Sequence, residues 1–152
     1  MIEPGLSHVS TFSVRVGEPV VIGRVAEGLR RVVPILGGRA HGPRLRGEIL
    51  PLGADFQVLR DDHSARLEAR YALRTDDDAT IGITNLGLRH GPADLVAKVA
   101  RGEVVDPALM YFRTVFSFET DHPDYLWLTK AIFLGSGERH PDRVEIAVYE
   151  VL

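Results

Sequence analysis

Short runs of apolar residues alternate with polar residues along most of the chain, and turn residues separate the runs. The pattern is found at residues 13–17, 19–26, 31–38, 47–53, 55–60, 65–75, 79–87, 110–120, 126–135 and 143–152. These runs are rich in Val, Ile, Phe and Tyr, which are typical of strands. Clusters of Asp at 60–65 and 75–80 separate consecutive runs, and Asp stabilises turns. The pattern predicts about ten antiparallel strands, some of them joined as hairpins.

One segment has helical spacing instead. Within residues 90–103, Pro92 fits the first helical position, Leu95 and Val99 share a face, and Gly102 ends the pattern. This spacing predicts one short α-helix at about 92–101, which lies across or plugs one end of the β structure. Residues 1–6 precede the first run and are expected to be frayed.

Many short strands, one helix and no long connection predict an all-β fold. We expect an antiparallel β-barrel of about 8–10 strands that forms a single domain over residues 1–152. A closed barrel removes the exposed edges of a sheet. A barrel of this size is filled by side chains or holds one small ligand.

Composition narrows the range of functions. The 152 residues carry a net charge of -3, which argues against a nucleic-acid-binding protein. The chain has no cysteine, which excludes disulfides, Cys-ligated metals and thiol catalysis. No long apolar run predicts a membrane helix, and the N-terminus does not resemble a signal peptide, so we expect a cytoplasmic protein. The six histidines lack metal-ligand spacing, and we expect neither a metal nor another cofactor.

Alternation within the strands indicates which side chains face the interior. Tyr71 lies on the apolar face of 65–75, and Asn85 continues the apolar stripe of 79–87. In 110–120, Phe112 lies on the apolar face, whereas Tyr111 and Arg113 lie on the other face. The pattern therefore sends Arg113 outward. An arginine between aromatic residues is nevertheless also a candidate partner for a ligand anion or another subunit.

Two acidic residues are candidates for acid–base chemistry. Asp55 stands at the start of a strand, where it is either a turn residue or, if the strand faces the lumen, an acid or base. Glu48 is the second candidate. Trp127 falls in the run 126–135 and is either a core residue or a wall of a ligand site.

Several motifs together resemble one known family. The segments "GPRLRGEILPLGADFQVLR", "EARYALRTDDDATIGITNLGLRHGPADLVAKVARGE", "YFRTVFSFET", "YLWL" and "VYEV" are similar to the bacterial family called domain of unknown function 3237, from about Val20 to Val151. The resemblance implies a small barrel-like antiparallel sheet with a short helix, usually in an oligomer. It covers the Gly53–Asp55 turn, Arg70-Tyr71, His90–Pro92, Tyr111–Arg113, Phe118–Thr120 and Trp127-Leu128. The chain departs from the family pattern at Phe56, Asp78, Phe116 and Thr129.

Two classes of function fit these features. The first is a metal-free and cofactor-free enzyme, of the cyclase, isomerase, lyase or hydratase type, that acts on a small apolar or aromatic metabolite. Its candidate catalytic residues are Asp55 or Glu48 as the acid–base group and Tyr71 and Arg113 at a developing oxyanion, to which Asn85 could also contribute. The candidate ligand-binding residues are Asn85, Phe112, Tyr111, Trp127, Arg70 and Phe56.

The second class is a non-catalytic carrier of a small apolar ligand, in which the same residues only orient the ligand. A third possible class is a structural protein whose lumen is completely filled by side chains. In each case we expect a homo-oligomer, a dimer or higher, that contacts neither nucleic acid nor membrane.

Overall fold

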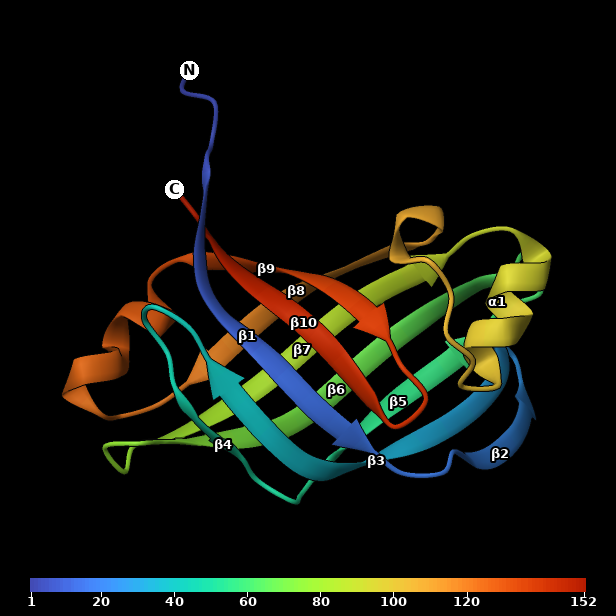
Figure 1. Cartoon of the computed structure of the whole chain (residues 1–152), viewed down its shortest axis with the longest axis horizontal. Coiled ribbons are helices and arrows are strands. Elements are labelled where there is room, and N and C mark those ends of the chain that lie inside the picture. Colours follow the sequence, from blue (N-terminus) through green and yellow to red (C-terminus); the bar gives the residue numbers. More distant parts are fainter.

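The computed structural model describes residues 1–152 and contains ten strands in one antiparallel sheet (Figure 1). The strands are β1 Leu6–Val16, β2 Val20–Val25, β3 Gly28–His41, β4 Gly47–Ile49, β5 Ala54–Leu59, β6 Ser64–Thr75, β7 Thr80–His90, β8 Tyr111–Glu119, β9 Ile132–Arg139 and β10 Arg143–Val151. The prediction of an antiparallel barrel with about ten strands and one short α-helix is confirmed.

The sheet closes because β1 pairs with β10 on one side and with the second half of β3 on the other. The short strands β4 and β5 both lie between β3 and β6, so they share one position in the wall. Strand β2 pairs with the first half of β3 alone and has one free edge. The closed wall therefore has eight strand positions, and β2 extends beyond it.

Three short helices join the strands. Helix α1 spans Ala93–Ala100, within the predicted range, and is followed by the 3-10 helix η1, Pro107–Leu109. A second 3-10 helix, η2, spans Pro123–Thr129. Helices α1 and η2 lie at opposite ends of the barrel (Figure 1). None of these helices has the length and apolar character needed to cross a membrane.

The placement of residues 126–131 in a strand was wrong. Trp127 belongs to η2, and β9 begins only at Ile132. Pro123 occupies the first turn of η2, where its fixed φ and missing N–H are tolerated, and His122 accepts a hydrogen bond from the Asp124 N–H at 3.2 Å. This local N-terminal geometry outweighs the apolar run that follows it.

The barrel interior is packed at the η2 end and hollow at the α1 end. The packed half contains large apolar side chains from every side of the wall, among them Val9, Phe12, Ile49, Leu73, Ile81, Phe116, Phe118 and Phe133. Two edge-to-face aromatic pairs, Phe12 with Phe116 and Phe118 with Phe133, have ring centroids 5.6 and 5.3 Å apart. This geometry is favourable for aromatic packing. The packed half therefore anchors the fold, and the other half is free to hold a site.

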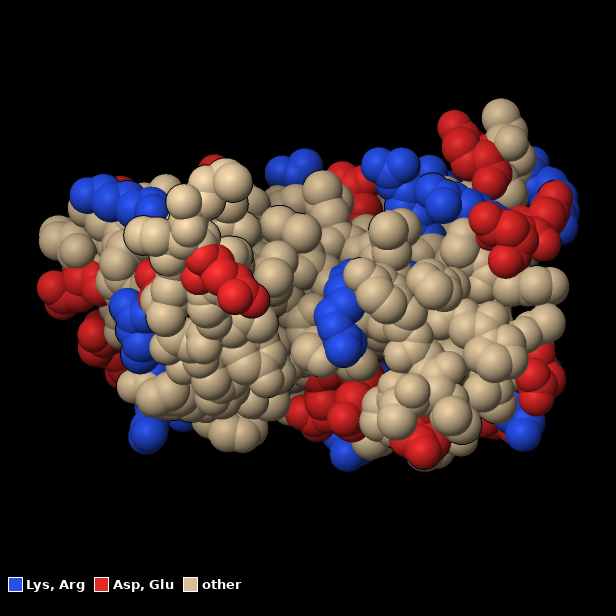
Figure 2. Space-filling model, turned by 90° about the horizontal axis from the view of Figure 1, so that it is seen from above, with Lys and Arg blue, Asp and Glu red and all other residues tan.

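The outer surface mixes charges of both signs. Figure 2 shows one face on which basic and acidic side chains form separate small groups, with wide uncharged areas between them. On this face no continuous basic surface is visible.

Candidate active site

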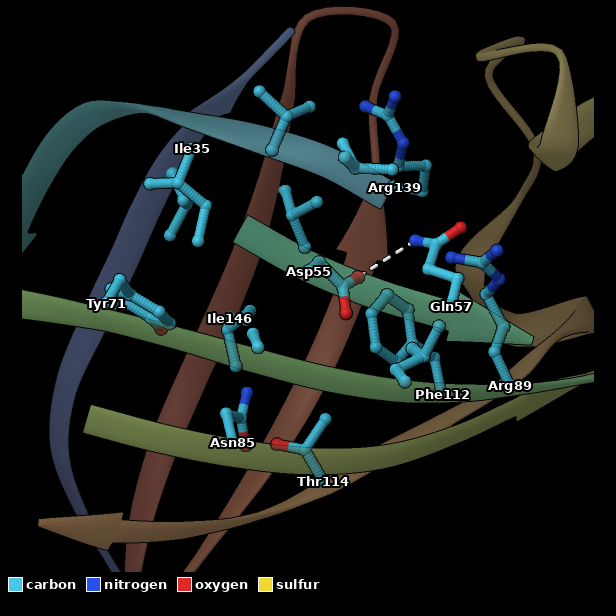
Figure 3. A pocket seen from close by; sticks show the side chains of 16 residues that line it. Ile35, Asp55, Gln57, Tyr71, Asn85, Arg89, Phe112, Thr114, Arg139 and Ile146 are labelled. Carbon is cyan, nitrogen blue, oxygen red and sulfur yellow. Dashed lines mark hydrogen bonds between the residues drawn. The ribbon is translucent and has the colours of Figure 1, made fainter. Parts of the chain in front are cut away.

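A cavity occupies the hollow half of the barrel (Figure 3). The cavity has a volume of about 50 Å³. A buried cavity needs about 10–15 Å³ of such volume to hold one water molecule, so this cavity can hold a few. The lining consists of Val14, Val16, Val33, Ile35, Asp55, Gln57, Leu67, Ala69, Tyr71, Asn85, Arg89, Phe112, Thr114, Arg139, Val144 and Ile146.

Each strand changes character as it passes from the packed half to the cavity. On β7 the inward positions Ile81 and Ile83 belong to the core, whereas Asn85 and Arg89 line the cavity. On β8, Phe118 and Phe116 belong to the core, and Thr114 lines the cavity. The strict alternation of the strand places all of these side chains inside. The polar groups are thus gathered at one end of an otherwise apolar interior.

Two inward-facing glycines of β9 leave room for residues of β8. A side-chain carbon at Gly137 would lie 2.8 Å from the Phe112 ring, and one at Gly135 would overlap the hydroxyl of Thr114. The Gly-Ser-Gly sequence at 135–137 is therefore explained by packing inside the barrel. Without these glycines, Thr114 and Phe112 could not occupy their positions against the cavity.

Asp55 holds the central position in the cavity and is fixed by two hydrogen bonds. Its Oδ2 accepts a hydrogen bond from Gln57 Nε2 at 2.8 Å, and its Oδ1 accepts one from the Glu68 backbone N–H at 3.1 Å. Gln57 is oriented in turn by Arg31, whose Nε donates to Gln57 Oε1 at 2.7 Å. A carboxylate oxygen can accept more than one hydrogen bond, so each oxygen of Asp55 keeps capacity for a ligand.

Burial raises the pKa of Asp55 above its ordinary value. Four influences oppose this effect in part: the hydrogen bond from Gln57, the positive charge of Arg89, the hydrogen bond from the Glu68 backbone N–H and the positive charge of Arg31. The carboxyl group is therefore less acidic than an ordinary aspartate. A raised pKa brings a carboxyl group closer to the range in which it can both accept and donate a proton.

Three polar atoms in the barrel interior have no hydrogen-bond partner. They are the Tyr71 hydroxyl, Asn85 Oδ1 and the Thr114 hydroxyl, and all three residues line the cavity. A buried polar atom without a partner costs about 1–3 kcal/mol. Burial, and to a smaller degree the charge of Asp55, also raises the pKa of Tyr71, so its hydroxyl stays protonated and can donate.

Three arginines surround the end of the cavity that α1 covers. Arg31 and Arg89 are buried, with 8% and 5% of their surface exposed, and Arg139 is half-buried. Arg31 donates to the Ala100 carbonyl at the end of α1 at 3.1 Å, and Arg139 donates to the His140 and Arg143 carbonyls. In Figure 3, Arg89, Arg139 and Gln57 lie toward one end of the cavity, and Tyr71 and Asn85 lie toward the other.

The structure brings four of the sequence candidates together in the cavity: Asp55, Tyr71, Asn85 and Phe112. The remaining candidates lie outside it. Glu48, Phe56, Arg70, Tyr111 and Arg113 are exposed on the outer side of the wall. Arg113 lies with its guanidinium carbon 5.8 Å from the Tyr111 ring centroid and donates to the Phe112 carbonyl at 2.9 Å. The prediction that Arg113 points outward is therefore confirmed.

Trp127 packs at the opposite end of the barrel from the polar cavity. Its ring lies 5.9 Å from that of Phe133 and is covered by the Arg44 guanidinium, whose carbon is 3.9 Å from the ring centroid. Among the departures from the family pattern, Phe116 lies in the packed core and Thr129 lies in η2. Neither of them lines the cavity, and neither does Phe56.

Sequence reasoning missed Arg31, Gln57, Arg89, Thr114 and Arg139 as site residues. A signal was available, because Arg89 has the same parity as Ile81 and Ile83, and Arg139 has the same parity as Phe133. Extending each apolar stripe to the end of its strand would have placed these arginines inside. No group of three or more His, Asp or Glu side chains forms a cluster able to hold a metal ion.

The fold and site define a closed antiparallel β-barrel with a small interior cavity that is polar at one end. Residues 4–151 match the family described as "Protein of unknown function (DUF3237)", and the chain belongs to that family. It is similar to the UPF0311 protein RPA1785 of Rhodopseudomonas palustris, with 48% identity over 145 residues and 95% of each chain covered. It is also similar to the UPF0311 protein CA_C3321 of Clostridium acetobutylicum, with 38% identity over 150 residues, 98% of this chain and 95% of that protein.

Solved structures show the same fold. The crystal structure of RPA1785 matches with a TM-score of 0.95 at 45% identity, with 100% of both chains covered. The crystal structure of an enzyme from Penicillium herquei matches with a TM-score of 0.75 at 16% identity, with 100% of this chain and 97% of that chain covered. At 16% identity, this similarity shows a shared fold and nothing more.

Proposed function

We propose that the protein binds a small molecule in the hollow half of the barrel and catalyses a cofactor-free acid–base reaction on it. The observation that carries the proposal is the set of three unpartnered polar atoms, on Tyr71, Asn85 and Thr114, which share one cavity with Asp55. An inert core would replace such groups by apolar ones, because each unpaired atom destabilises the folded state. A ligand with matching polar atoms removes this cost.

Asp55 is the residue suited to move the proton. Its carboxylate takes a proton from a C–H or O–H group of the bound molecule, and the resulting carboxylic acid returns the proton to another atom of that molecule. The Tyr71 and Thr114 hydroxyls donate hydrogen bonds to the oxygen on which negative charge develops. The net change is an isomerisation, a cyclisation, an elimination or a hydration, none of which consumes an oxidant or a reductant.

The apolar part of the lining supports the same proposal. Ten of the 16 lining residues are hydrophobic, so water is largely excluded and the few polar contacts become stronger.

A carrier needs the same wall and a polar anchor but no proton-transfer group, and it is the second function to be tested. The enzyme described from Penicillium herquei has the same fold, which supports the suitability of this barrel for catalysis.

The test is metabolite profiling with variants of the cavity. Wild-type protein is incubated with a small-molecule extract of its source cells, and the compounds are compared by mass spectrometry before and after. We expect one compound to fall and another to rise. Asp55→Asn should reduce this conversion by at least about 100-fold, because general acid–base catalysis contributes about 10²–10⁴-fold. Tyr71→Phe should also reduce it, by about 100–1,000-fold, through the loss of one oxyanion donor.

Asp121→Asn is the matched control, since Asp121 is exposed and makes no side-chain hydrogen bond or ion pair. Its conversion rate should equal that of the wild type. Native mass spectrometry of the same mixtures identifies a retained compound. A compound that is retained unchanged by wild type and by Asp55→Asn alike would establish the carrier. Conversion that survives Asp55→Asn would refute the role of Asp55.

A further inference from the structure

The guanidinium of Arg89 is buried without a counterion. Only 5% of the residue is exposed, and no carboxylate oxygen lies within 4.0 Å of its nitrogens. Arg31 and Arg139 donate to protein oxygens, whereas Arg89 donates no side-chain hydrogen bond. Its one aromatic contact is with Phe112, whose ring centroid lies 5.6 Å from the guanidinium carbon.

The surroundings of Arg89 increase this imbalance of charge. Burial lowers the pKa of Arg89 to about 10; the negative charge of Asp55 opposes this shift, and the positive charges of Arg31 and Arg139 add to it. Even so, the group remains protonated at neutral pH. The one carboxyl group that lines the main cavity is that of Asp55. It already accepts hydrogen bonds from the Gln57 side chain and from the Glu68 backbone N–H. Arg31 and Arg89 thus share the charge of Asp55, which burial disfavours, whereas Arg139 also interacts with Asp142 and Glu18.

Arg89 also lies between two cavities. It lines the main cavity together with Arg139, and both arginines line a smaller cavity of about 20 Å³ on the α1 side. Glu138 lines the smaller cavity, but its carboxylate lies 3.4 Å from His140 and forms no ion pair with either arginine. The donors of Arg89 therefore border two small cavities and no protein acceptor. A buried charge without a partner destabilises the folded protein unless a partner is supplied.

We infer that the ligand is a small organic anion, a carboxylate or a similar oxyanion on an apolar body, and that Arg89 binds its charged end. This inference rests on the proposed function and names the class of its substrate. The guanidinium presents paired N–H donors that fit a carboxylate in two-point geometry. The apolar body lies along the wall formed by Val33, Val144 and Ile146, with Asp55, Tyr71 and Asn85 beside it. Sequence reasoning had predicted an apolar or aromatic ligand, and the anionic end extends that prediction.

The experiment compares anions with neutral molecules of the same shape. Binding of 4-fluorobenzoate and 4-fluorobenzamide, and of hexanoate and hexanamide, is measured at neutral pH by ligand-observed NMR. We expect wild-type protein to bind the anion of at least one pair about ten-fold or more tightly than its amide. Arg89→Met should abolish the preference, and Arg89→Lys should keep part of it, because lysine restores the charge without the planar fork.

Matched controls distinguish the possible outcomes. Arg24→Met removes an exposed arginine of β2 and should leave the preference unchanged. If anions and amides bind equally, or if no probe binds, the anion inference is overturned. If sodium sulfate displaces the organic anion at equal concentration, the site holds inorganic anions and the inference is overturned as well. Thermal unfolding of Arg89→Met tests folding separately, and we expect its Tm to match or exceed that of the wild type, because an unpaired buried charge is removed.

The two proposals fail in different ways. If conversion in the extract requires Asp55 but the compound consumed is uncharged, the proposed function stands and the anion inference falls. If anions bind through Arg89 but no compound is converted, the site is an anion carrier and the catalytic proposal falls. Each result therefore bears on one proposal independently of the other.

Discussion

At the scale of single residues, the surroundings of Asp55 act on its pKa in opposite directions. Burial raises its pKa, and the hydrogen bonds and nearby arginines lower it again in part, with burial the larger effect. The folded protein therefore holds the proton more tightly than the unfolded chain does. The resulting stabilisation is fully present below about pH 4, the ordinary pKa of aspartate, and is lost as pH rises through the raised pKa.

This linkage predicts a pH dependence of stability that Asp55→Asn should weaken. The free energy of unfolding of the wild type, measured by urea denaturation from about pH 4 to about pH 8, should fall more steeply than that of the variant. The comparison of slopes is needed because asparagine also changes the hydrogen bond with Gln57, and that effect does not depend on pH. Parallel slopes would show that Asp55 titrates in the folded protein as it does in the unfolded chain.

Single side chains also mark how far the sequence predicts the site. Alternation places Tyr71, Asn85 and Phe112 inside and Arg113 outside, and the structure agrees. The same alternation places Arg89 inside, yet the rule that charges face solvent favours the opposite assignment. The two rules conflict only at a strand end beside a polar cavity. Sequence reasoning failed at this position because the cavity itself cannot be read from one strand.

At the scale of elements, the turn before β5 positions Asp55. Gly53 has a φ of 87°, which L-residues with a side chain adopt at a cost, and a side-chain carbon there would overlap the Arg70 carbonyl oxygen. The Gly53 carbonyl also accepts a hydrogen bond from the Ile35 N–H at 3.1 Å. The close approach to β6 sets the register in which Asp55 lies opposite Ala69.

Gly53→Ala should therefore move the start of β5 away from β6. We expect the free energy of unfolding to fall by about 1–3 kcal/mol, the usual cost of a strained backbone position, in urea denaturation. Gly82→Ala is the control, since its added carbon would lie 3.6 Å from Glu119 in ordinary contact. Its stability should stay within about 0.5 kcal/mol of the wild type. A Gly53→Ala protein as stable as the wild type would mean that the turn relaxes freely.

Elements were more predictable than their exact ends. Strong alternation over 65–75 and 110–120 identified β6 and β8 correctly, because both faces of each strand meet a consistent environment. The run 126–135 combined the end of η2 with the start of β9, and the composition of both parts is apolar. Where a helix and a strand are equally apolar, periodicity alone does not separate them.

At the scale of the whole molecule, closure of the barrel creates the site. Arg31, Gln57, Arg89 and Arg139 lie on β3, β5, β7 and β9, and only the wrapping of the sheet brings them to one end. Helix α1 then covers that end, and the carbonyl of its last residue, Ala100, accepts a hydrogen bond from Arg31 at the helix end that carries partial negative charge. No segment shorter than the whole barrel contains this arrangement. The site is thus a property of the topology.

The outer wall of the barrel carries a groove that we propose as the contact in a homo-oligomer; half of its lining is apolar, and Arg60, Arg66 and Arg113 line it as well. Leu86 lies opposite Val115 across β7 and β8, and Val115 lies opposite Leu134 across β8 and β9. Leu86 and Val115 are 49% and 50% exposed, and the groove that they line has a volume of about 610 Å³. Exposed apolar side chains that are rimmed by polar ones are typical of a surface that another protein covers.

Light scattering after size exclusion tests this expectation. The mass of the wild type should be a multiple of 16.8 kDa, and Val115→Glu should reduce it to that of one chain, because the substitution places a charge in a desolvated contact. Ile22→Glu, on the free edge of β2 where Ile22 is 62% exposed, is the control and should leave the mass unchanged. If Ile22→Glu alone dissociates the oligomer, the subunits associate through the β2 edge instead. A wild type that runs as a single chain at about 50 µM would refute the oligomer, since association is favoured as concentration rises.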